Sequence, residues 1–204
     1  MALVLGVTGG IATGKSTVLK MLSDLGALTL SADTIAHEVL AKDTPAYRQV
    51  FERFGSEVLG PDGEVDRSAL AAVIFTDPVA REDLNAITHP HIIRRVREHI
   101  DSFRRSPPSP DSVLAIEIPL LMECGLESMV DQVLVVAAEQ ETQVGRLTSR
   151  SGISPQEALR RIQTQMPVSQ KVERADIVIW NDGDLDELEG SVKDLWEEIK
   201  SLQR

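Results

Sequence analysis

A run of nine residues near the N-terminus combines the glycine, lysine and hydroxyl side chains that phosphate binding requires. Residues 9–16 of this run fit the pattern G-x-x-x-x-G-K-[ST] of the phosphate-binding loop, or P-loop, and Thr17 follows it. In this pattern Lys15 would reach the β- and γ-phosphates of a nucleotide, and the hydroxyl of Ser16 would ligate Mg²⁺. The predicted nucleotide-binding residues are Gly9, Gly10, Ala12, Thr13, Gly14, Lys15, Ser16 and Thr17.

The flanking sequence indicates the elements that would position this loop. Residues 2–7 form a short apolar run typical of a buried strand, and residues 15–25 carry apolar side chains at helical spacing. The loop would thus lead into a helix N-terminus, where free N–H groups and the helix dipole favour a polyphosphate. A glycine-rich turn that only links strand to helix is a weaker interpretation, because the full motif is in register with both elements.

A carboxylate follows the next predicted strand. Residues 27–31 read as a strand, and Asp33 comes directly after it. Ligands bind beyond the carboxyl ends of parallel strands, so Asp33 could accept the proton of an attacking hydroxyl during phosphoryl transfer. Asp33 could equally cap the helix that begins at Thr34. The residues alone leave both interpretations open.

Arginines gather in the C-terminal half of an otherwise acidic chain. Arg146 and Arg150 are spaced i, i+4 on one predicted helix, and Arg160 and Arg161 follow on the next. Guanidinium groups suit phosphate oxygens, so the first pair is predicted to close over the phosphates as part of a mobile lid. The other interpretation is a solvated face on which these arginines pair with Glu139, Glu141 or Glu157.

Composition excludes several classes of protein. The 204 residues carry a formal charge of −11, which disfavours general nucleic-acid binding. Apolar runs are too short to span a membrane, and we expect no signal peptide because the N-terminus lacks a basic segment. Cys124 is the single cysteine, so an intrachain disulfide is impossible. We therefore expect a cytoplasmic protein.

The order of the predicted elements indicates an α/β fold with a helical insertion. Further strands are predicted at 113–118, 131–137 and 176–180, and a C-terminal amphipathic helix at 185–202. Strands that alternate with helices favour a parallel sheet covered on both faces. Two more helices are predicted at about 139–150 and 155–165, and Trp180 and Trp196 are interpreted as packing aromatics.

Residues 34–104 contain no convincing strand. Their pattern predicts only helices, at 34–40, 45–54, 67–75, 79–87 and 90–103. The expected domains are a P-loop core at 1–33 and 105–204, which includes a lid at about 140–170, and a helical insertion at 34–104.

A P-loop alone does not define a reaction. The sequence contains neither N-K-x-D nor D-x-x-G, which argues against a GTPase. A small-molecule kinase is favoured, and a nucleotide-dependent switch that binds a protein partner is the alternative from another class. Among kinases, a nucleoside or nucleotide kinase is the second enzyme hypothesis.

Nearly the whole chain resembles the dephospho-CoA kinase family. The P-loop is shared with many families, but several other segments in this order are more specific. The matching segments are GVTGGI at 6–11, GKST at 14–17, ADTIAHEV at 32–39, VDRSAL at 65–70, ITHPHI at 87–92, IPLL at 118–121, the helix of Gln143, Arg146 and Arg150, ADIVI at 175–179 and NDG at 181–183.

The resemblance implies a P-loop kinase core with a five-stranded parallel sheet, a helical acceptor-binding domain and a helical lid. It implies transfer of the γ-phosphoryl of ATP, with Mg²⁺, to the ribose 3′-hydroxyl of dephospho-CoA, the last step of coenzyme A biosynthesis. ATP and dephospho-CoA are the expected partners, without nucleic acid or membrane.

The resemblance also assigns roles to single residues. Asp33 takes the place of the base, with Lys15, Arg146 and Arg150 as its catalytic companions, and Asn181 and Gly183 lie beside the adenine of ATP. The residues implied on the acceptor side are Thr8, Asp33, Arg67, His89, Pro119 and Leu120. The chain departs from the family pattern at Ser31 and Glu117, where the family usually has Asp.

Overall fold

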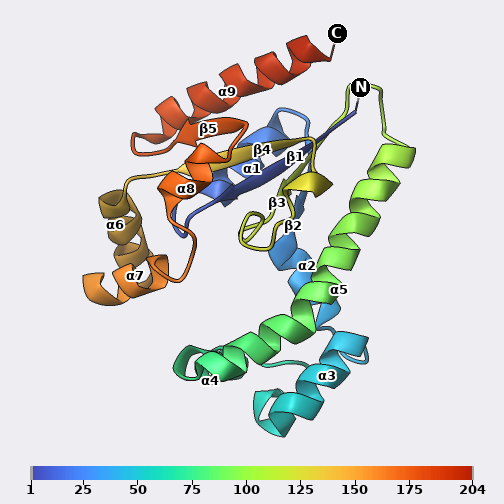
Figure 1. Cartoon of the computed structure of the whole chain (residues 1–204), viewed down its shortest axis with the longest axis vertical. Coiled ribbons are helices and arrows are strands. Elements are labelled where there is room, and N and C mark those ends of the chain that lie inside the picture. The colour runs from blue at the N-terminus through green and yellow to red at the C-terminus, as the bar shows by residue number, and fades with distance from the viewer. Residues whose placement is uncertain (1, 204) are drawn as a thin grey trace. The chain divides into compact units, whose positions relative to one another are not determined.

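A parallel five-stranded sheet is built from strands at both ends of the chain. The computed structural model describes residues 2–203, and within them the strand order is β2-β3-β1-β4-β5, with every neighbouring pair parallel (Figure 1). The α/β fold class and the five-stranded parallel sheet predicted from the sequence are confirmed. The strands are β1 (Leu3–Gly9), β2 (Leu28–Ser31), β3 (Val113–Glu117), β4 (Gln132–Ala137) and β5 (Ile177–Trp180).

Two helices cover one face of this sheet. They are α1 (Lys15–Asp24) and α9 (Leu185–Leu202), which lie beside each other in Figure 1. Buried side chains of both helices join the sheet in one core, among them Val18, Leu22, Val192 and Ile199. The apolar spacing that predicted these helices therefore corresponds to the faces that pack on the strands.

Three shorter helices lie between β4 and β5. They are α6 (Gln140–Ser151), α7 (Pro155–Ile162) and α8 (Val168–Glu173). Ser154 caps α7 by accepting a hydrogen bond from Glu157 N. The predicted helix at 155–165 is too long, and α8 was not predicted. Pro167 explains the break, because proline cannot donate the backbone hydrogen bond that a continuous helix would need there.

The chain divides into two compact units. Residues 1–31 and 102–204 form the first, and residues 32–101 form the second. The second unit consists of α2 (Ala32–Val39), α3 (Pro45–Phe54), a 3₁₀ turn η1 (Gly55–Val58), α4 (Arg67–Thr76) and most of α5 (Pro78–Arg105). An isolated bridge joins Leu59 to Val65. This unit has its own small core of Val50, Val58, Leu70 and Leu84. Another 3₁₀ turn, η2 (Glu127–Met129), belongs to the first unit.

The helix α5 corrects the prediction of two helices at 79–87 and 90–103. A single helix runs through both, with Pro90 inside it. Proline removes one backbone N–H and disfavours the helical conformation of the preceding residue, which is why the sequence indicated a break. Buried side chains on both sides of this position, among them Leu84, Thr88 and Val96, favour a continuous helix, because tertiary packing can outweigh local propensity.

Trp180 corrects a second expectation. Its position in β5 suggested a packing aromatic, but 51% of the residue is exposed. Trp196 on α9 does pack against the sheet core, as expected. Trp180 is the last residue of its strand, whereas Trp196 lies inside α9.

Candidate active site

The P-loop joins β1 to α1 and uses backbone conformations that side chains rarely allow. Gly9 has φ 150° and Gly14, the N-cap of α1, has φ 97°. A Cβ at Gly9 would lie 2.1 Å from the carbonyl oxygen of Val136, and one at Gly14 would lie 2.2 Å from Asn181 Nδ2. Both glycines of the motif are therefore required by close approach as well as by conformation.

Two side chains of the loop are directed back onto its own backbone. Lys15 Nζ donates to the carbonyl of Gly10 at 2.7 Å, and Thr13 Oγ1 donates to the same carbonyl at 3.0 Å. Lys15 is only 9% exposed. The ammonium group is thus held against the loop, at the start of a helix whose first-turn N–H groups have no intrahelical partners.

The hydroxyl of Ser16 contacts a buried carboxylate. Ser16 Oγ donates to Glu117, with distances of 3.0 Å to Oε1 and 3.2 Å to Oε2. Glu117 ends β3, pairs with Val7 of β1 and is 5% exposed. Mg²⁺ prefers hard oxygen ligands and takes only one or two from the protein when it bridges phosphates. Ser16 and Glu117 therefore fit a magnesium site, and Glu117 reaches the hydroxyl despite its extra methylene.

Two buried amides hold the carbonyls of the P-loop. Gln143 Nε2, on α6, donates to Ile11 O at 2.7 Å, and Asn181 Nδ2, after β5, donates to Thr13 O at 2.8 Å. Gln143 is 2% exposed and Asn181 6%. Sequence reasoning placed Gln143 only in a matching helix and assigned it no role, because its partner lies 132 residues away in the chain. The loop is thus fixed by groups from distant segments.

Five of the ten predicted nucleotide residues line one cavity of about 380 Å³, whereas Gly9, Gly10, Thr13, Lys15 and Ser16 do not line it. It is lined by Ala12, Gly14, Thr17, Arg146, Arg150, Asn181, Gly183, Asp184, Leu185 and Leu188. The structure thus brings the P-loop, both arginines of α6 and the turn after β5 together. Asp184 caps α9 by accepting from Glu187 N at 3.0 Å, which orders one wall of this cavity.

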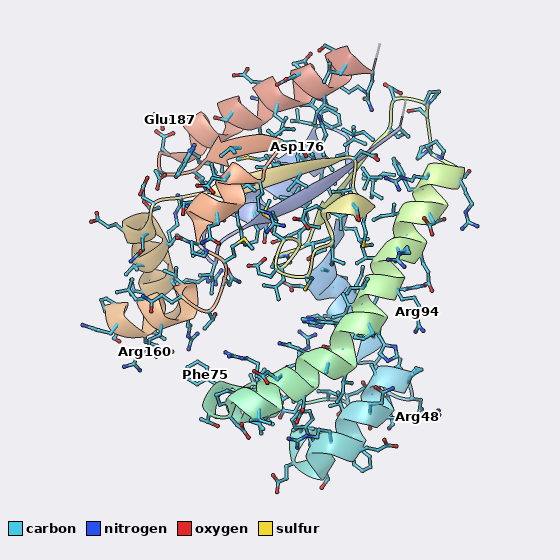
Figure 2. All side chains as sticks on the ribbon, viewed as in Figure 1. Arg48, Phe75, Arg94, Arg160, Asp176 and Glu187 are labelled. Atoms are coloured by element: carbon cyan, nitrogen blue, oxygen red, sulfur yellow. The ribbon has the colours of Figure 1, made fainter. Side chains whose placement is uncertain are left out.

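The arginines of the two lid helices differ in their surroundings. Arg146 Nη2 donates to Asn181 Oδ1 at 3.3 Å, whereas within residues 2–203 its buried Nη1 has no hydrogen-bond partner. Arg160 and Arg161 form ion pairs with Glu157 on their own helix. Figure 2 shows Arg160 at the outer end of α7, with 78% of its side chain exposed. Only the pair on α6 lines the nucleotide cavity.

The residues assigned to the acceptor side fall in both units. In the first, Thr8 Oγ1 donates to the carbonyl of Pro119 at 3.1 Å, and Leu120 follows in the turn after β3. The same carbonyl accepts from Lys171 Nζ at 3.0 Å. Lys171 is fully buried and pairs with Glu123, a contact that the sequence did not suggest.

The other acceptor residues, Asp33, Arg67 and His89, belong to the second unit. The helix α2 begins at Ala32, so Asp33 lies in its first turn and is not the N-cap that one interpretation made it. Arg67 follows Asp66, which caps α4. Burial lowers the pKa of Arg67, and the charge of Asp33 opposes this shift. Burial likewise lowers the pKa of His89 on α5.

Two features are absent from the described residues. Among residues 2–203, no group of three or more His, Cys, Asp and Glu side chains is arranged to hold a metal ion. In the same range, no helix combines the length and the apolar character that crossing a bilayer would need.

A parallel sheet with a P-loop after its first strand, and arginines of α6 beside that loop, defines a P-loop kinase fold. Comparison with known proteins specifies the family. The dephospho-CoA kinase family profile matches residues 3–187, so the chain belongs to this family. The dephospho-CoA kinase of Moorella thermoacetica is 45% identical over 97% of this chain and 92% of its own.

Two further relatives agree. The dephospho-CoA kinase of Geobacter metallireducens is 44% identical over 96% of each chain. The solved structure of the Campylobacter jejuni dephospho-CoA kinase is 26% identical, covers 100% of both chains and superposes with a TM-score of 0.74. The family resemblance inferred from the sequence is confirmed.

Proposed function

We propose that this protein is an ATP-dependent kinase that phosphorylates the ribose 3′-hydroxyl of dephospho-CoA. The observation that carries the proposal is the cavity that unites the P-loop with Arg146, Arg150 and Asn181 in a chain of this family. The 3′-oxygen would form a bond to the γ-phosphorus of ATP while the bond from that phosphorus to the β-phosphate oxygen breaks. The products would be coenzyme A and ADP.

Different side chains would have different roles in this transfer. Lys15 and the N-terminus of α1 would stabilise negative charge on the transferring phosphoryl group. The Asp33 carboxylate would accept the proton of the 3′-hydroxyl. Arg146 and Arg150 would bind phosphate oxygens, which suits the unpaired Nη1 of Arg146 among the described residues.

Magnesium would be held by Ser16 and Glu117 together with phosphate oxygens, and when bound it would neutralise phosphate charge. Asn181 and Gly183 would lie beside the adenine of ATP. The helical unit, with Arg67 and His89, and the segment of Thr8, Pro119 and Leu120 would bind the acceptor. A reducing cytoplasm is the compartment we propose, because Cys124 has no second cysteine to pair with.

The test is ADP production with Mg²⁺ and ATP, measured with dephospho-CoA and with a panel of nucleosides and nucleoside monophosphates. Stimulation by dephospho-CoA alone, with coenzyme A identified by mass, is the expected result. Equal stimulation by a nucleoside would overturn the acceptor. No stimulation by any acceptor in a folded, ATP-binding protein would favour a nucleotide-dependent switch.

Two variants test the assigned roles. Lys15→Ala should abolish turnover. Asp33→Asn should lower kcat by roughly 10²-fold or more, the usual range for losing a general base, with little change in ATP affinity. If Asp33→Asn kept kcat and lowered only thermal stability, Asp33 would be structural. Lys20→Ala is a matched control, because Lys20 on the same helix is exposed and forms a surface ion pair with Asp24.

A further inference from the structure

A second cavity also has residues of the P-loop in its wall. Its volume is about 460 Å³, and Gly10 and Ile11 of the loop form part of its wall. The remaining wall comes from the residues that follow β4, from α6, from most residues of the segment 162–169, which ends α7 and begins α8, and from Trp180. None of the predicted site residues other than Gly10 lines it, so neither the motifs nor the family segments assign it a role.

The charge of the walls separates this cavity from the nucleotide cavity. Arg146 and Arg150 line the nucleotide cavity, whereas none of the described residues around the second cavity is a lysine or arginine. Glu139 adds a negative charge at its edge. A phosphate would be repelled there and would find no cationic partner, so the cavity suits an uncharged group.

Most polar side chains of the cavity are amides, and Glu139 and Ser169 are the others in its lining. Its lining contains four glutamines, Gln140, Gln143, Gln163 and Gln165, among apolar side chains such as Ile162 and Met166. Within residues 2–203, Gln165 Oε1 is buried and accepts no hydrogen bond. A buried acceptor without a donor costs free energy, which a ligand N–H can recover. Trp180 contributes a half-exposed ring on which a flat group can stack.

We propose that this cavity binds the purine base of the acceptor, with the exocyclic amino group donating to Gln165 Oε1. The inference rests on the proposed function, in which both substrates are adenine nucleotides. Two cavities that share the P-loop as a wall provide one place for each base. The cationic cavity would take the donor, and the neutral cavity would take the acceptor base.

The position of the cavity agrees with the reaction. Gly10, on its wall, is the residue whose carbonyl holds Lys15 Nζ at 2.7 Å. A base bound beside Gly10 would keep its ribose close to the lysine that contacts the transferring phosphoryl group. The neutral cavity would therefore distinguish acceptors that carry an adenine from those that present only a ribose hydroxyl.

Gln165→Leu tests the amide. It removes the acceptor oxygen while keeping most of the side-chain volume, so the KM for dephospho-CoA should rise about fivefold, the effect of one net hydrogen bond. The KM for ATP should not change, and the melting temperature should hold or rise because an unsatisfied oxygen is removed. Gln170→Leu, at an exposed position outside the cavity, is the control and should change neither KM.

The outcomes are distinct. An unchanged KM for dephospho-CoA, or a rise in the KM for ATP instead, would overturn the assignment of the cavity. If the wild-type protein made no coenzyme A at all, the proposed function itself would be wrong. That result would be known before any variant is measured.

The fluorescence of Trp180 tests the proposal without a substitution at Gln165. With a non-hydrolysable ATP analogue at saturation, dephospho-CoA should quench the fluorescence of Trp180, while 4′-phosphopantetheine, which lacks the base, should not. Trp180→Phe leaves Trp196 on α9 and should abolish the change. Quenching that persists in Trp180→Phe, or that phosphopantetheine reproduces, would contradict binding of the base beside Trp180.

Discussion

The fully buried ammonium of Lys171 provides a sharp test of how α8 and the segment before it are anchored to the core. Lys171 Nζ donates to Glu123 Oε2 and to the carbonyl of Pro119, both at 3.0 Å. The other oxygen of Glu123 accepts from the backbone N–H of Met166 at 3.1 Å. The pair thus joins α8 and the segment that follows α7 to the turn after β3. We expect Lys171→Met to loosen this connection.

The magnitude follows from burial. Removing one partner of a buried ion pair costs about 3–5 kcal/mol, because the other charge stays without compensation. The side chain of Glu123 is 21% exposed, so water would recover part of this loss. We therefore expect Lys171→Met to lower the free energy of unfolding by about 3 kcal/mol. Glu123→Leu combined with Lys171→Met should recover much of this loss, since neither charge then remains buried.

Urea denaturation followed by tryptophan fluorescence measures the unfolding of the first compact unit, residues 1–31 and 102–204, because Trp180 and Trp196 both belong to it. Lys193→Met is the matched control, since its ion pair with Glu189 is exposed and should contribute less than about 1 kcal/mol. A loss below about 1 kcal/mol for Lys171→Met, or a double variant as unstable as the sum of the two single changes, would refute the reasoning.

Three further predictions concern the site. Gln143→Ala should raise the KM for ATP and lower kcat, because the carbonyl of Ile11 loses its 2.7 Å donor and the loop loosens; unchanged steady-state kinetics would contradict this. Arg150→Ala should lower kcat at least tenfold, whereas an unchanged kcat would place Arg150 on a solvated face. Burial lowers the pKa of His89 in the folded state, so the unfolded chain binds the proton first as the pH falls below about 6.5. Stability by thermal denaturation should therefore be highest above that pH and decrease on acidification, and His89→Gln should flatten this dependence; an equal slope in both proteins would contradict it.

Local patterns specified most of the fold. The C-terminal helix was predicted at 185–202 and begins and ends at those residues, because its apolar stripe faces the sheet core. The five strands were found as short apolar runs, since strands covered on both faces lack alternation. The errors in the helices occurred at Pro90 and in the segment from Ile162 to Glu173, where α7 ends early and α8 was missed. Proline makes the helical conformation less favourable locally. Whether the helix continues depends on how many side chains of the neighbouring turns are buried.

The sequence by itself determined the chemistry of the P-loop. Few functions other than phosphate binding require glycines, a lysine and a serine at this spacing, and the interactions of such a loop are local in the chain. The sequence also determined the family, because segments such as ADTIAHEV and ITHPHI occur in a characteristic order.

Only the tertiary structure decided which distant groups hold that loop. Gln143 and Asn181 lie more than a hundred residues away in the chain and donate hydrogen bonds to its carbonyls. Glu117, at the end of β3, accepts a hydrogen bond from Ser16. Only the structure paired Lys171 with Glu123, and only it revealed the neutral cavity beside Gly10. Such contacts depend on the packing of separate elements and leave no spacing pattern in the sequence, because each partner alone resembles an ordinary polar residue of its helix or strand.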